Sequence, residues 1–167
     1  MVSYMTDMIR EIKDSEIKQC VSIIRQSFQT VADEFGFTEE NAPYFTAFAT
    51  DEAKVLMWKN EQHRPMYGYF EDEVLVGYYN LAFPSEGECE LGSLCVLPGK
   101  RHSGIGDALL EDAISRAKEL GFGKMKLSIV EENKLLRKWY EDHGFVHVGT
   151  KKFDFFPFTC GYLERSI

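Results

Sequence analysis

The chain has 167 residues, of which 44% are hydrophobic and 28% are charged, and its formal net charge is −8. This length and balance are typical of a domain that buries its own core without metals or disulfides, so we expect a single domain over residues 1–167. The acidic charge without a basic stripe disfavours nucleic-acid binding, and no apolar run reaches the roughly 20 residues that span a bilayer.

The first third of the chain predicts one short strand followed by helices. Residues 1–16 mix charges with apolar side chains and contain no signal-peptide core, so a cytoplasmic location is expected. Met8–Ile12 predicts a strand. A helix is predicted from Asp14 or Ser15 to about Phe35, because apolar residues recur there at intervals of three to four and Gly36 can end it. Residues 38–60 predict one or two short helices.

The remainder alternates strands with helices. Strands are predicted at Met66–Phe70, Val74–Phe83, Cys89–Val96, Lys124–Val130, Phe145–Phe153 and Thr159–Arg165, and helices at Gly104–Leu120 and Lys134–His143. A strand–helix–strand unit implies one parallel pair, whereas the hairpins imply antiparallel pairs. The fold class is therefore α/β (α+β), with a mixed, mostly antiparallel sheet of about six to seven strands and helices on both faces.

Four cysteines are present, and their spacing does not indicate a metal site. Cys20, Cys89, Cys95 and Cys160 form no Cys-x-x-Cys pair and show no ligand spacing with the four histidines. We expect reduced, mostly buried thiols and no bound metal.

The stretch "PGKRHSGIGDALLEDA" (Pro98–Ala113) lies between a predicted strand and a predicted helix. The first amides of a helix have no intrahelical partner and carry partial positive charge. Gly104 and Gly106 allow a ligand close to the backbone, and Arg101 adds a positive charge, so the stretch predicts a phosphate or pyrophosphate site. A plain strand-to-helix turn is the alternative. The Gly-Lys-Ser/Thr ending of a Walker loop is absent, and Leu109 stands where a dinucleotide fingerprint needs its third glycine.

Two motifs together resemble the GNAT superfamily of acyl-CoA-dependent N-acyltransferases. "RHSGIG" (Arg101–Gly106), which follows "LCVLP", is similar to the family's pyrophosphate loop, and "NKLLRKWYEDHGF" (Asn133–Phe145) is similar to its second signature. The resemblance is strongest over residues 90–145. It implies a splayed parallel pair, with a bulge that separates the strand at Leu94–Val96 from the next parallel strand. His102 replaces the commoner glycine and Ser103 the commoner basic residue, so this loop carries less charge than is usual.

The resemblance implies acetyl-CoA as co-substrate and a set of residues that hold it. The pyrophosphate is expected on the backbone amides of Arg101, His102, Ser103, Gly104, Ile105, Gly106 and Asp107. The pantetheine is expected beside Leu94, Cys95 and Val96, paired like an added strand, with amides near Cys95 and Val96 facing the thioester carbonyl. Asn133 is expected to contact the pantetheine or the acyl group; a simple helix N-cap is the alternative, and both can hold.

The resemblance also implies catalytic residues. Glu90 is the candidate general base, with Glu88 on the same face of the strand and water as competitors. Tyr140 is expected to approach the coenzyme sulfur and donate a proton to it, and the alternative is a buried core aromatic. His143, at a helix C-terminus, is interpreted as structural.

The acceptor side is less well determined by the sequence. Candidates for its lining are Tyr44, Phe45, Phe48, Asn80 and Phe153–Phe158, and candidates for a carboxylate that holds a cationic amine are Asp33, Glu39 and Glu40. The leading hypothesis is an enzyme that transfers an acetyl group from acetyl-CoA to a primary amine of a small molecule or peptide. The alternative is a catalytically silent acyl-CoA sensor of the same fold. Neither nucleic acid nor membrane is expected as a partner, and a homodimer is left open.

Overall fold

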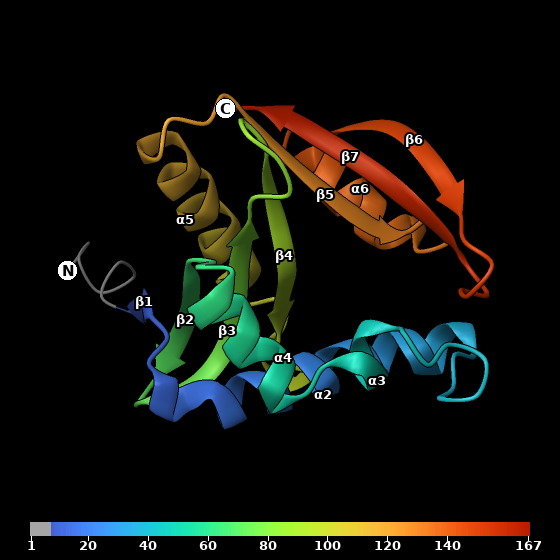
Figure 1. Ribbon diagram of the computed structural model, residues 1–167, viewed down its shortest axis with the longest axis horizontal. Coiled ribbons are helices and arrows are strands. Elements are labelled where there is room, and N and C mark those ends of the chain that lie inside the picture. The colour runs from blue at the N-terminus through green and yellow to red at the C-terminus, as the bar shows by residue number, and fades with distance from the viewer. Residues whose placement is uncertain (1–7) are drawn as a thin grey trace.

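The computed structural model describes residues 8–167, whose strands form one sheet in the order β1-β2-β3-β4-β5-β7-β6 (Figure 1). Residues 1–7, which belong to the segment expected to lack a signal-peptide core, lie outside the described residues. The strands are β1 (Ile9–Glu11), β2 (Met66–Glu71), β3 (Val74–Ala82), β4 (Cys89–Val96), β5 (Lys124–Val130), β6 (Val146–Lys152) and β7 (Thr159–Ser166). Only β4 and β5 pair in parallel among them, which confirms the predicted mixed, mostly antiparallel sheet.

The helices lie close to where the periodicity predicts them. They are α2 (Ile17–Phe35), α3 (Thr46–Ala49), α4 (Glu52–Leu56), α5 (Ile105–Glu119) and α6 (Lys134–Asp142), with short helical turns η1 (Asp14–Glu16), η2 (Met57–Glu61) and η3 (Pro98–Lys100). Gly36 ends α2 in a left-handed conformation, φ 74°, as a C-terminal glycine does. Residues 38–60 differ from the prediction in detail, because turns come first and the two short helices are followed by the π-helical turn η2.

Helices cover both faces of the sheet, as predicted. On one face, α5 and α6 pack over the strands through residues such as Leu109 and Tyr140. On the other face, α2 and η2 pack through residues such as Ile24 and Trp58. We call these the α5 face and the α2 face. The four cysteines are free, and Cys160 alone among them is partly exposed.

Candidate active site

The parallel strands β4 and β5 are paired only where they begin. Cys89 lies opposite Met125 and Glu90 lies opposite Lys126, and beyond these positions β4 pairs with β3 while β5 pairs with β7. The two strands diverge from that point (Figure 1). The edge of β4 that follows Glu90 therefore has no strand partner on its β5 side within residues 8–167. Such an edge can hydrogen-bond an extended ligand as an added strand.

A bulge interrupts β4 beside this open edge. Ser93 and Leu94 together lie opposite Tyr79 alone, and Ser93 has a left-handed φ of 50°. The extra residue reverses the alternation of side chains, since Leu91 before the bulge and Val96 after it both pack on the α5 face. Regular alternation would place two residues five positions apart on opposite faces. The bulge thus changes which face of the sheet each side chain at the end of β4 points to.

The glycine-rich stretch forms a tight loop that leads into α5. His102 and Gly104 both have positive φ, 63° and 85°, and α5 begins at Ile105, one residue after the predicted start. A Cβ on Gly104 would meet nothing within 4 Å, so the glycine is required by its backbone conformation and the loop is open on that side. The first amides of α5 face outward from the helix start, where an anion is favoured.

The side chain of Arg101 is bonded within the protein. Its guanidinium donates to the carbonyl oxygens of Val96 (Nε, 3.2 Å) and Ser27 (Nη2, 3.0 Å) and to Oγ1 of Thr30 (Nη1, 3.1 Å). These bonds fasten the loop to β4 and α2. The hydroxyl of Ser103 donates to the carbonyl of Lys100 at 2.6 Å. The charge of Arg101 stays at the loop, but the groups most free to bind an anion are backbone amides.

The two candidate bases on β4 lie in different environments. Glu88 accepts a hydrogen bond from Nζ of Lys126 at 3.1 Å, and this bond, with a second from Ser85, lowers its pKa. Glu90 is half-buried, and burial raises its pKa, while the positive charge of Arg64 opposes that increase. A carboxyl whose pKa is raised towards neutrality is the better proton acceptor in the sense of a general base. The geometry therefore favours Glu90 over Glu88.

Tyr140 is buried beneath the splayed strands. Its ring packs edge-to-face on Trp139 and Phe145, with centroids 5.0 and 5.5 Å away. Burial raises its pKa, and the neighbouring Cys95 raises it further, so the phenol keeps its proton. Burial also raises the pKa of Cys95 to about 12, which makes that residue a thiol at neutral pH rather than a nucleophilic thiolate. Tyr140 is thus a core aromatic whose hydroxyl is retained in its acid form near the end of β4.

Asn133 caps α6, since its Oδ1 accepts a hydrogen bond from the amide of Leu136 at 3.3 Å. At the other end of α6, His143 is hydrogen-bonded to Asp107 (Nε2–Oδ1, 2.7 Å) and to the carbonyl of Trp139 (2.7 Å). The Asp107 contact joins the C-terminus of α6 to the first turn of α5. The hydrogen bond between His143 and Asp107 therefore fixes α6 relative to α5.

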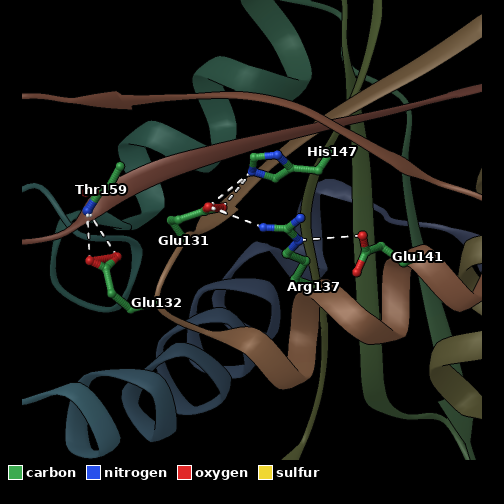
Figure 2. Close-up of polar contacts among 6 residues, drawn as sticks. All are labelled: Glu131, Glu132, Arg137, Glu141, His147 and Thr159. Carbon is green, nitrogen blue, oxygen red and sulfur yellow. Dashed lines mark hydrogen bonds and ion pairs between the residues drawn. The ribbon is translucent and has the colours of Figure 1, made fainter.

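A polar network that the sequence reasoning missed supports the β5–α6 turn. Figure 2 shows the side chain of Glu131 hydrogen-bonded to His147 of β6 (2.8 Å) and 3.6 Å from Nη1 of Arg137. The carboxylate of Glu132 accepts a hydrogen bond from the amide of Thr159 at 3.1 Å. The network ties the end of β5 to α6, β6 and β7. Its only sequence signal is the pair of carboxylates before Asn133, since the partners are distant in the chain.

Several acceptor candidates prove to be core residues. Phe45 and Phe158 are buried and pack on Phe37, with ring centroids 5.1 and 4.8 Å away. Tyr44 is 64% exposed and stacks edge-to-face on Phe155. The acidic candidates lie exposed at the end of α2 and in the turns after it: Asp33, Glu39 and Glu40.

Asn80 is fully buried and donates to the hydroxyl of Tyr78 at 3.1 Å. Its Oδ1 accepts a hydrogen bond from Nη1 of Arg64 at 3.2 Å. Sequence reasoning did not single out Arg64, because it lies in a polar turn with no motif around it. Arg64 donates a hydrogen bond to the buried amide of Asn80, and its positive charge also opposes the increase that burial causes in the pKa of Glu90.

The comparisons with known proteins fit this geometry. The family model described as "Acetyltransferase (GNAT) family" matches residues 29–145. The chain belongs to the GNAT acetyltransferase family. The open edge of β4, the bulge and the loop before α5 are thus features of a GNAT protein. No curated protein sequence matches the chain.

Within residues 8–167, no helix is long and apolar enough to cross a membrane, and no cluster of three or more potential ligands could hold a metal ion.

Solved structures share the whole fold at low sequence identity. The PaiA N-acetyltransferase of Thermoplasma acidophilum, in complex with coenzyme A, has a TM-score of 0.79 and 20% identity, covering 95% of this chain and 98% of that one. The ribosomal-protein-alanine N-acetyltransferase of Brucella melitensis has a TM-score of 0.73 and 19% identity, covering 95% and 99%. YncA of Salmonella typhimurium, a putative acetyltransferase with acetyl-CoA bound, has a TM-score of 0.72 and 18% identity, covering 95% and 92%. At these identities the likeness establishes the fold.

Proposed function

We propose that this GNAT protein is an N-acetyltransferase that moves an acetyl group from acetyl-CoA to a primary amine of a small molecule or peptide by direct attack. The observation that carries the proposal is the position of Glu90. It is a half-buried carboxyl with a raised pKa at the last paired position of the splayed strands, next to an edge that can hold an extended thioester. A domain that only senses acyl-CoA does not need a proton acceptor there.

The protein groups around the splay fit a coenzyme A thioester. The open loop and the first amides of α5, from Arg101 to Asp107, would bind the pyrophosphate. The unpaired edge at Leu94–Val96 would pair with the amides of the pantetheine arm. Asn133, at the start of α6, would contact the pantetheine or the acyl group while it caps the helix. Two of the solved relatives, PaiA and YncA, contain coenzyme A and acetyl-CoA respectively, which supports this choice of donor.

The residues at the splay supply what aminolysis of a thioester requires. The amine nitrogen attacks the carbonyl carbon, forming a C–N bond, and the C–S bond breaks. Glu90 accepts the proton that the amine loses, directly or through a water. Backbone amides near Cys95 and Val96 would donate to the oxygen as negative charge develops on it. Tyr140, held in its protonated form by burial, donates a proton to the leaving sulfur.

A turnover screen tests the proposal. Acetyl-CoA is incubated with the protein and a panel of primary amines, and free thiol release is measured. We expect amine-dependent release that is lost in Glu90→Gln. Calorimetric binding of acetyl-CoA with no amine-dependent release from any class of amine would favour the sensor instead.

A further inference from the structure

A row of side chains on the α2 face, at the level of Glu90, crosses β3, β4, β5 and the segment that precedes β2. Ala82 of β3 lies opposite Glu90, and Lys126 of β5 lies opposite it on the other side. The amide of Leu81 donates to the carbonyl of Pro65 at 3.0 Å, so the pairing of β3 continues before β2 begins. This continuation brings Arg64 beside Ala82. The row therefore reads Arg64, Ala82, Glu90, Lys126.

Arg64 is half-buried, and its partners within residues 8–167 are neutral. Its Nη1 donates to Oδ1 of Asn80 (3.2 Å) and its Nε to Oε1 of Gln62 (2.8 Å), and the guanidinium lies 4.8 Å from the ring centroid of Trp58. No carboxylate oxygen of the described residues lies within 4 Å of it. Partly desolvated guanidinium groups are usually paired with carboxylates.

Two other partly buried arginines show that contrast, whereas Arg25, Arg101 and Arg165 donate to backbone carbonyls. Arg10 is paired with Glu16 at 2.6 Å, and Arg116 with Asp112 at 2.8 Å. Arg64 is thus a cation whose orientation is fixed by the side-chain amides of Asn80 and Gln62 and by the ring of Trp58. Its guanidinium still has N–H groups that are available to a ligand. A planar guanidinium of this kind suits a carboxylate in particular, because two parallel hydrogen bonds can form.

Arg64 and Glu90 lie in the same row without forming an ion pair. Each affects the titration of the other, yet their charged groups are not within ion-pair distance. Two strand spacings, about 10 Å, separate their backbones. The side chain between them, Ala82, is small and partly exposed. Lys126 does not compete for Glu90, because its amine is bound to Glu88. Ala82 thus lies between a cation, Arg64, and the candidate base, Glu90, in the row.

We propose that Arg64 binds the carboxylate of the acceptor, so that the acceptor is an amine that also carries a carboxylate, as an amino acid does. The amine then lies at Glu90 and the carboxylate at Arg64, with the body of the acceptor over Ala82. This inference rests on the proposed transferase function and adds the class of its acceptor. A polyamine would place a second cation at Arg64 and would be repelled.

Matched pairs of acceptors test the inference. Thiol release from acetyl-CoA is measured with L-amino acids and 4-aminobutyrate, with the carboxamide of each, and with spermidine. We expect at least one acid to exceed its carboxamide by about 10–100-fold in kcat/KM, the effect of a charge-assisted, bidentate contact. Equal or better turnover of carboxamides, or of spermidine alone, would overturn the carboxylate assignment and leave the transferase function standing.

Three variants locate the effect. Arg64→Met should raise KM for the acid by about 10–100-fold more than KM for the carboxamide, whereas Arg64→Lys keeps the charge and should lose less of this preference. Ala82→Leu keeps both charges but fills the space between them, and it should abolish turnover of the acid with acetyl-CoA affinity retained. Lys59→Met is the control, since Lys59 on the same segment pairs with Asp14 and should leave the preference intact. Full activity of Ala82→Leu would contradict the proposal.

Binding measurements separate this inference from the proposed function. The acids and carboxamides are titrated calorimetrically into each variant saturated with coenzyme A. If no amine releases thiol, the transferase proposal fails, yet acid binding to the wild type and not to Arg64→Met would still assign Arg64 as a carboxylate site. Equal binding of acids and carboxamides would overturn that assignment.

Discussion

Glu90→Gln is the most direct test of the proposed chemistry. Glutamine keeps the size of the side chain and its place in the half-buried row, but it cannot accept a proton from the amine. Acetyl-CoA would bind elsewhere, at the α5 loop and the edge of β4, so its affinity should not change. The substitution therefore separates proton transfer from donor binding.

The magnitude follows from the environment of Glu90. A positioned general base contributes about 10²–10⁴-fold, so Glu90→Gln should lower kcat by that factor, or about 3–5 kcal/mol of transition-state stabilisation. Burial raises the pKa of Glu90, so its protonated, inactive form persists to higher pH than in an exposed glutamate. Wild-type kcat should therefore fall as the pH decreases through a value above about 4.3. That acidic limb should be absent from the variant.

Glu88→Gln provides the matched control on the same strand and face. Glu88 is tied to Lys126 at 3.1 Å, and its pKa is lowered, so it is poorly suited to accept a proton. Its removal should leave kcat within about twofold of the wild type. The assay is initial-rate thiol release between pH 5 and 9, with acetyl-CoA affinity measured by calorimetry. A larger loss in Glu88→Gln than in Glu90→Gln would move the base along the strand. Wild-type rates in both variants would mean that the amine arrives already neutral.

Three other substitutions address the rest of the site. Gly104→Val places a β-branched side chain at φ 85° and should weaken coenzyme A binding by about 10–100-fold in calorimetry; unchanged affinity in the folded variant would make the stretch a plain turn. Tyr140→Phe keeps the ring and should lower kcat by about 10–10³-fold with donor affinity unchanged, and because burial raises the phenol pKa, the wild type should show no alkaline limb from it below about pH 10. Full activity of that variant would assign the proton to solvent. Gly92→Ala would bring a Cβ within 2.4 Å of Oδ1 of Asn80, and the loss of that residue's two hydrogen bonds should cost about 2–4 kcal/mol in denaturant unfolding. An unchanged midpoint would show that Asn80 moves aside freely.

The strands, the helices and the single parallel pair follow from local periodicity and connection rules, and they could be predicted. The bulge in β4 is expected from the family resemblance, but its position could not be derived from local periodicity. Residues 88–93 alternate as a regular strand would, and the deviation depends on how β4 pairs with β3. Gly92 lacks a side chain, and the amide of Asn80 occupies that space. This packing joins residues that are twelve positions apart, so no local pattern encodes it.

Arg101 shows how a motif can identify a loop correctly without showing how its side chain acts. The sequence places a positive charge beside two glycines, which suggests a direct phosphate ligand. In the structure, the guanidinium is bound to Ser27 and Thr30 of α2 and to the carbonyl of Val96. Those α2 partners lie more than 70 residues earlier in the chain. The same holds for Glu131, which follows β5, because its partner His147 lies near it only through the pairing of β6 with β7 and of β7 with β5.

The proposed acceptor class depends on strand register rather than on a motif. Arg64 precedes β2, Ala82 ends β3 and Glu90 begins the open part of β4, and each segment looks unremarkable by itself. They share one row and one face only because Pro65 pairs with Leu81 and Ala82 with Glu90. A slip of one residue in either pairing would move its side chains to the opposite face, where α5 and α6 lie. On this proposal, variation at the position of Arg64 would change which amine is accepted, while the proposed donor site on α5 and the edge of β4 would stay the same.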